Sequence, residues 1–184
     1  MTPKPVYIAD IIGDIVAKVN DVLIGQLQEY DPNIVAINYQ FGEYKEVFGT
    51  LVQQGKEAGG AKKYPLIWLW MPITLDAGGT VGVAEVSPLR IIIARWGNNT
   101  DKTAERYCNN FKPVLYPIYL ELLNQLYLDP RIISEVSSQI PHRHIDWPYW
   151  GGESPPEDAN PFSDYVDAIE LKDLKINLLL KNCY

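Results

Sequence analysis

The chain is poor in the residues from which most catalytic and metal sites are built. It has two cysteines, Cys108 and Cys183, and two histidines, His142 and His144. The cysteines form no CxxC pair, so we expect two separate reduced thiols. A serine or cysteine nucleophile would have to take its general base from the one histidine pair. We therefore predict no catalytic residues and no cofactor.

Long hydrophobic runs are also missing. The longest uncharged apolar run, Tyr64 to Leu75, is too short to cross a bilayer and contains two prolines. The N-terminal segment 1–23 is interrupted by Asp10, Asp14 and Lys18, so it does not resemble a signal peptide. These features predict a protein made in the cytosol that does not insert into a membrane.

Positive charge is scarce. The formal net charge is −7, and a surface of this sign repels phosphate backbones, which argues against a nucleic-acid reader. The composition is otherwise that of a globular protein, with 47% hydrophobic and 21% charged residues. A length of 184 residues suits one domain, 1–184.

The spacing of apolar residues predicts two helices. The first begins near Pro5 and ends before Asp31, and its core residues recur at three- and four-residue steps. The second runs from Asp101 to Leu128, bent or broken near Pro113 and Pro117. Thr100 or Asp101 can cap it. The predicted core of the first helix is Ile8, Ile11, Ile12, Ile15, Val19, Val22, Leu23 and Leu27.

Apolar and β-branched runs predict the strands. The segments Tyr64–Thr74 and Leu89–Trp96 are expected to pair as an antiparallel hairpin, the first covered on both faces because both are apolar. Further strands are predicted at 34–41, 132–137 and 165–180, with 81–86 a short strand or part of the hairpin loop. The last is one long strand or two linked by Asp173. This order predicts an α+β fold, an antiparallel or mixed sheet with two main helices packed on one face.

Two segments lack a regular pattern. Residues 42–63 are predicted to be a flexible, exposed connection with room for a helical turn. Residues 140–162 are predicted to be a long loop rich in proline, glycine and aromatic residues.

Known chemical motifs fit poorly. Gly49, Gly55 and Lys56 have one residue too many for a phosphate-binding loop, and Glu57 would repel phosphates. On an extended backbone His142, His144 and Asp146 point to one side, as metal ligands would. A structural zinc site needs a fourth ligand, however, and no cysteine pair is near. We therefore interpret the histidines as solvated loop residues and predict no metal.

Aromatic residues with a polar group are abundant, with 12 Tyr and 5 Trp against 4 Phe. Such residues are frequent at subunit interfaces and also in cores. Trp147, Tyr149 and Trp150 therefore either close the protein's own core or insert into a neighbouring subunit.

The second helix is apolar on more than one face, through Leu120, Leu123 and Tyr127. One stripe is enough to pack on a sheet, so the extra width predicts a second contact, with the first helix or with another subunit. The predicted interface residues are Trp147, Tyr149, Trp150, Tyr116 and Tyr119.

Several short runs resemble the neck and tail-completion proteins of tailed bacteriophages, in particular the tail-terminator group. These runs are Tyr64-Pro65-Leu66-Ile67-Trp68-Leu69, Leu89–Arg95, Phe111–Ile118 and Asp167–Leu171. The resemblance implies a virion protein, assembled in the host cytoplasm, that forms a homo-oligomeric ring of about six or twelve subunits at the head–tail junction. It also implies contacts with connector or portal and tail-tube proteins, no catalytic residues, and a lumen through which DNA passes without specific binding.

Two alternatives remain open at this point. One is an intracellular adaptor domain that binds a peptide along a sheet edge, for which the final strand is the candidate. The other is a small hydrolase that uses His142 or His144. The ring predicts a fixed large oligomer, the adaptor a monomer, and the hydrolase an activity that a His→Ala substitution abolishes.

Overall fold

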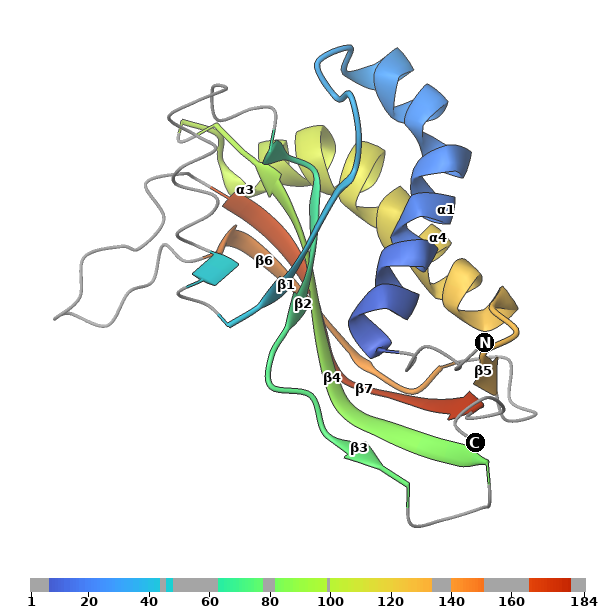
Figure 1. Cartoon of the computed structure of the whole chain (residues 1–184). Helices are drawn as coiled ribbons and strands as arrows, with labels where there is room; N and C mark the ends of the chain where they lie inside the picture. Colours follow the sequence, from blue (N-terminus) through green and yellow to red (C-terminus); the bar gives the residue numbers. More distant parts are fainter. Residues whose placement is uncertain are drawn as a thin grey trace, which may run out of the picture.

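The computed structural model has the predicted α+β architecture, with one seven-stranded mixed sheet and helices on one of its faces (Figure 1). The described residues are 7–43, 46–47, 63–77, 82–98, 100–133, 140–150 and 166–179. Both predicted helices are present, and they lie side by side across the sheet. No described helix combines the length and the hydropathy that crossing a membrane requires.

Helix α1 spans Ile8–Tyr30 and presents one apolar stripe to the sheet. Most of the predicted core is buried, but Val22 is 56% exposed, so its assignment to the core was wrong. Asp31 ends the helix in an extended conformation, as expected for a residue that precedes proline. The buried residues of α1 are Ile11, Ile12, Ile15, Val16, Val19, Leu23 and Leu27.

The second helical segment is continuous but changes its winding. It consists of α3 (Thr103–Arg106), the π-helical η2 (Tyr107–Leu115) and α4 (Tyr116–Leu128). Pro113 lies inside η2. Proline has no backbone N–H to donate to the preceding turn, and a change to the wider π-helical winding accommodates this. The predicted caps were wrong, because the helix begins after Lys102, whose backbone N–H donates to the Glu105 carboxylate at 2.7 Å.

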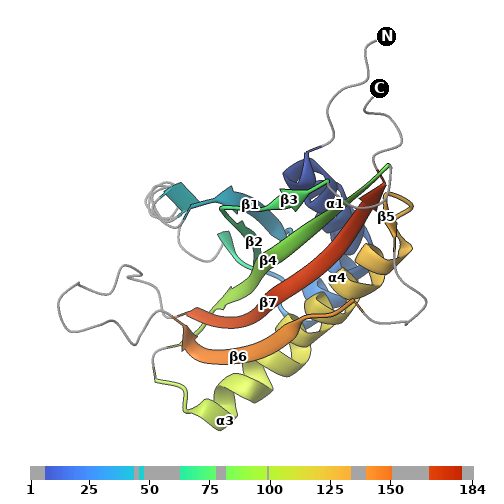
Figure 2. The same cartoon turned by 90° about the horizontal axis from the view of Figure 1, so that it is seen from below.

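The sheet is built on two long antiparallel strands, β4 (Val83–Trp96) and β7 (Val166–Leu179). On one side, β2 (Leu66–Trp70) pairs antiparallel with β4, and β1 (Asn38–Gly42) pairs parallel with β2. On the other side, β6 (Arg143–Trp150) and β5 (Ile132–Ile133) pair with successive parts of β7. The short β3 (Leu75–Asp76) pairs with β4, and Figure 2 shows α4 running along the β6 side.

Three strand predictions need correction. Residues 140–162 were predicted to be a loop, yet 143–150 form β6. In the described part of the chain this strand pairs only with β7, and a strand at the edge of a sheet tolerates a proline such as Pro148. The segment 34–41 forms a strand only from Asn38. The runs 81–86 and 89–96 join into one strand, whose register shifts lie around Pro88.

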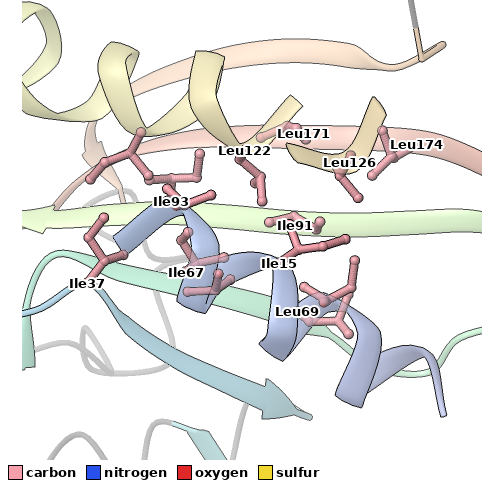
Figure 3. Close-up of a cluster of buried hydrophobic side chains, with 14 of the residues drawn as sticks. Ile15, Ile37, Ile67, Leu69, Ile91, Ile93, Leu122, Leu126, Leu171 and Leu174 are labelled. Atoms are coloured by element: carbon pink, nitrogen blue, oxygen red, sulfur yellow. The ribbon is translucent and has the colours of Figure 1, made fainter. Parts of the chain in front are cut away.

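The sheet is buried on both faces near its centre. The helix side carries the main core, part of which Figure 3 shows between α1, α4 and strands β2, β4 and β7. On the opposite side Trp68, Ile92, Ala94 and Ala168 form a second apolar cluster, which confirms that β2 is covered on both faces. Asp173 has a φ of 57°, which aspartate tolerates better than most residues. It lies within one continuous β7, so the final strand is not two strands.

Several predictions fall on other parts of the chain. Within 42–63, Glu46 and Val47 have the helical conformation that was expected there, and Val47 is buried. Residues 44–45 and 48–62 of that connection lie outside the described residues, as do 134–137 of the predicted strand 132–137, residues 151–162 and Cys183.

Candidate functional site

A polar cluster joins β6 to the second helical segment. In the register of β6 and β7, His144 lies opposite Leu171 and Asp146 opposite Ile169, both of which belong to the helix-side core. Because side chains alternate along a strand, His144 and Asp146 face the helices. The prediction that they point to one side is confirmed, but on a strand and not in a solvated loop.

Asp146 is the centre of this cluster. Its Oδ2 accepts hydrogen bonds from the hydroxyls of Tyr107, at 3.1 Å, and Tyr116, at 2.6 Å. Its Oδ1 lies 2.6 Å from Nε2 of His144. Burial, followed by the contacts with Asp146, raises the pKa of both tyrosines, so they stay protonated and act as donors at neutral pH.

His142 is held by a second set of contacts. Its Nδ1 lies 2.7 Å from the carbonyl oxygen of Ile140, and its Nε2 lies 2.8 Å from the hydroxyl of Tyr119. A carbonyl oxygen can only accept, so Nδ1 carries the proton and Nε2 of the neutral ring accepts from Tyr119. Both histidines are therefore engaged in contacts within the protein.

Next to this cluster lies an open groove of about 400 Å³. It is lined by residues of α4 and by residues that precede β6, and two of them, Tyr119 and His142, are hydrogen-bonded to each other. Leu120 is 62% exposed and Tyr127 is 46% exposed, which is unusual for large apolar side chains on one helix face. The lining residues are Tyr119, Leu120, Leu123, Asn124, Tyr127, Ile140 and His142.

The wide apolar surface of the second helix was predicted to contact either the first helix or another subunit. Helix α1 packs beside α4, yet Leu120 and Tyr127 remain exposed. The first helix is therefore not the contact for this face. Of the predicted interface residues, Tyr119 lines the groove, whereas Tyr116 does not line it and donates to Asp146.

The other three predicted interface residues lie elsewhere along β6. Trp150 packs edge-on against Trp68 on the opposite face of the sheet, with ring centroids 6.0 Å apart. Tyr149, with a φ of 64°, places its ring 3.6 Å from the guanidinium of Arg106. Trp147 stays partly exposed while its Nε1 donates to the Glu170 carboxylate at 2.8 Å. These three side chains are thus not part of the groove.

Sequence reasoning missed a buried ion pair at the end of β6. Arg106 Nη1 donates to Asp167 Oδ1 at 2.7 Å, and both side chains have no solvent exposure. Asn110 donates to the other oxygen at 2.5 Å. A Cβ on Gly97 would lie 2.7 Å from Arg106 Nη1, so this position has no room for a side chain. The available signal was Asp167, a charge inside the apolar run of the last strand.

A second missed group lies on the face of the sheet that the helices do not cover. Arg90 stacks over the ring of Trp70 at 4.0 Å, and its Nε lies 2.5 Å from Glu170 Oε1. Trp147 donates to the other oxygen of this carboxylate. The group links side chains of β2, β4, β7 and β6, so it ties four strands together.

The described residues contain no group of three His, Cys, Asp or Glu side chains placed to hold a metal ion. His144 and Asp146 form only a pair, and Asp146 is already used by two tyrosines. Cys108 is an exposed thiol. The groove beside this pair offers apolar side chains together with the hydrogen-bonding groups of Asn124 and His142.

Comparison with known proteins does not assign the chain to a family. No family model matches it, and neither a curated protein nor a solved structure matches it. The function therefore has to be inferred from the residues and their geometry.

Proposed function

We propose that the protein is a virion structural protein that assembles into a homo-oligomeric ring at the head–tail junction of a tailed bacteriophage. The observation that carries this proposal is the groove on α4 with its exposed Leu120 and Tyr127, in which Tyr119 is hydrogen-bonded to His142. Large apolar side chains that are exposed together on a folded domain mark a site where another molecule binds.

The resemblance of the sequence to tail-terminator proteins supports the ring and its place in the virion. The α+β fold supports it only in general terms, because many functions use such a fold. The net charge of −7 fits a lumen through which DNA passes without adhering. In this proposal one rim of the ring contacts the connector or portal and the other contacts the tail tube.

The contacts of the two histidines narrow the hydrolase alternative to one of them, His144. His142 is bonded to Tyr119 and Ile140, and His144 is bonded to Asp146. A general base must have a free acceptor within reach of the proton that it removes. On His142 both ring nitrogens are engaged, whereas on His144 a proton on Nε2 that is donated to Asp146 leaves Nδ1 as an acceptor.

The adaptor alternative loses its original candidate edge. The final strand, β7, was expected to be a free edge, but it pairs with β4 on one side and with β5 and β6 on the other. That expectation was wrong because β6 was not recognised as a strand. Among the described strands, β1 and β6 pair on one side only, as do the two-residue β3 and β5, so β1 and β6 are the longer candidate edges for an added peptide.

Light scattering of the purified full-length protein over a wide concentration range tests the proposal. A closed ring has a fixed number of subunits, so we expect one discrete species of about six or twelve subunits. A monomer at every concentration would contradict self-assembly into a ring. A mass that grows steadily with concentration would indicate open, unclosed association and would contradict it as well.

A further inference from the structure

We propose that β6 is the receiving edge for an extended segment of another polypeptide, in which acidic and apolar residues alternate. The added strand would continue the sheet beyond β6. Its acidic side chains would lie beside Arg143 and Lys172, on the face of the sheet that the helices do not cover, and its apolar side chains would point toward the groove on α4. The inference does not depend on the ring, because it concerns contact with a different protein.

The backbone of β6 is open on one side. In the described part of the chain this strand pairs only with β7. Every second residue of an edge strand directs its N–H and C=O groups away from the neighbouring strand, where they can pair with an added one. The register with β7 is regular from Arg143 to Trp147 and shifts before Trp150. The part of β6 that can receive a strand is therefore 143–147.

Two cations lie side by side on the outer face of this edge. His144 and Leu171 face the helices, so their chain neighbours Arg143 and Lys172 face the other side of the sheet. Both cations are exposed, and they are register partners on adjacent strands. Like charges that lie directly opposite each other in a sheet repel, so a carboxylate beside them would be stabilising.

The carboxylates on this face leave the two cations open to a further partner. Asp173 lies 3.6 Å from Arg143, and both side chains are at least half exposed, so this pair contributes little. Glu170 is already bound by Arg90, at 2.5 Å, and by an indole N–H, at 2.8 Å. Among the described residues Lys172 has no ion-pair partner. Acidic side chains on an added strand would therefore complement this edge.

The helix side of the same edge meets the groove. The groove is lined by residues of α4 and by Ile140 and His142, which lead into β6. Figure 2 shows α4 running along the β6 side of the sheet, so a strand added to β6 would extend the sheet on the side of this helix. Leu120 and Tyr127 are exposed there. Because side chains alternate along a strand, every second residue of the added strand would point toward this groove, and apolar residues would cover it.

The alternating pattern fits a different polypeptide better than a second copy of this chain. The two longer open edges among the described strands are β1 and β6. Strand β1 consists of residues 38–42, none of which is acidic. On β6 the positions of the outer face are Arg143, Ile145 and Trp147, which also lack a carboxylate. Neither edge of another copy can supply the acidic side chains.

Fluorescence anisotropy with short labelled peptides tests the proposal on the full-length protein. The probe alternates leucine and glutamate, and its matched control alternates leucine and lysine. The net charge of −7 by itself favours the lysine peptide. We expect the glutamate peptide to bind at least about tenfold more tightly, and the same peptide with N-methylated backbone amides not to bind. A preference for the lysine peptide, or undiminished binding of the N-methylated one, would overturn the proposal.

A charge reversal and hydrogen exchange locate the site. Arg143→Glu, at a position that is 68% exposed, should abolish the preference for glutamate. Lys102→Glu, at an exposed position before α3, changes the net charge equally and should leave the preference intact. With the glutamate peptide bound, amide exchange should slow in 143–147 and stay unchanged in β1. An unchanged preference in Arg143→Glu, or protection of β1 in place of β6, would show that the proposed edge is wrong, while the ring is tested separately by light scattering.

Discussion

Two side chains without solvent exposure connect helix α3 to the end of the sheet where β4, β6 and β7 meet. Arg106 and Asp167 form an ion pair there, and the backbone N–H of Tyr149 donates to the same carboxylate at 3.2 Å. A buried ion pair adds little net stability, but removal of one partner leaves an uncompensated charge. The pair therefore fixes how the helix docks against the strands more than how stable the fold is.

Gly97 tests this tight packing most directly. Gly97→Ala would place a methyl group 2.7 Å from Arg106 Nη1 and 2.9 Å from Asp167 Oδ2, both in a buried ion pair. We expect a loss of about 1–3 kcal/mol in the free energy of unfolding, measured by urea denaturation. Gly25→Ala is the matched control, since nothing lies within 4 Å of a Cβ there. It should stabilise the protein by about 0.5–1 kcal/mol, because alanine favours a helix. Equal effects of the two substitutions would contradict the account.

At the scale of elements, the turn between α4 and β5 is tied to α1 through one carboxylate. Asp129 is buried and accepts hydrogen bonds from Arg131, at 2.8 Å on each oxygen, and from Lys18 on α1, at 3.0 Å. The hydrogen bonds from Arg131, opposed by burial, hold the pKa of Asp129 well below its usual range. This carboxylate therefore links stability to pH.

Because folding lowers the pKa of Asp129, this carboxylate should make the protein less stable as the pH falls. A carboxylate whose pKa is depressed in the folded state contributes stability above its unfolded pKa of about 3.9, and this contribution is lost as the pH falls below that value. We expect Asp129→Asn to be less stable than the wild type by a constant amount between pH 5 and pH 8. The difference should shrink as the pH falls below about 4, in urea titrations repeated at each pH. A difference that does not change in acid would show that Asp129 is not held as an ion.

The Asp146 cluster joins strand β6 to the second helical segment. Asp146→Ala would leave the hydroxyls of Tyr107 and Tyr116 and the ring of His144 without their acceptor. We expect a cost of about 1–3 kcal/mol and faster amide hydrogen exchange in β6 than in the wild type, with β2 unchanged. Tyr116→Phe removes one donor and should show the same pattern to a smaller degree. Equal acceleration in β2 and β6 would point to global destabilisation instead.

How far the elements can be predicted from sequence depends on where their signals lie. The stripe of α1 and the alternation in β7 are periodic over long runs, so both were found. Strand β6 was missed because Pro148 and the aromatic residues around it resemble a loop, and its pairing with β7 depends on distant residues. The alternation of His142, His144 and Asp146 was visible, but their partners Tyr107 and Tyr119 were not, because tertiary packing brings them together.

For the whole molecule, the central feature is one sheet with a different surface at each edge. The groove beside β6 exposes Leu120 and Tyr127, and the opposite edge exposes Phe41. In the proposed ring each copy would contact two neighbours through unlike surfaces.

Electron microscopy of the purified, negatively stained protein tests the ring most directly, because it shows shape as well as size. The account predicts class averages of closed rings with an open centre and about six- or twelvefold rotational symmetry. Particles with only twofold symmetry or open filaments would contradict it. A field of single subunits, even in samples prepared at high protein concentration, would contradict it as well.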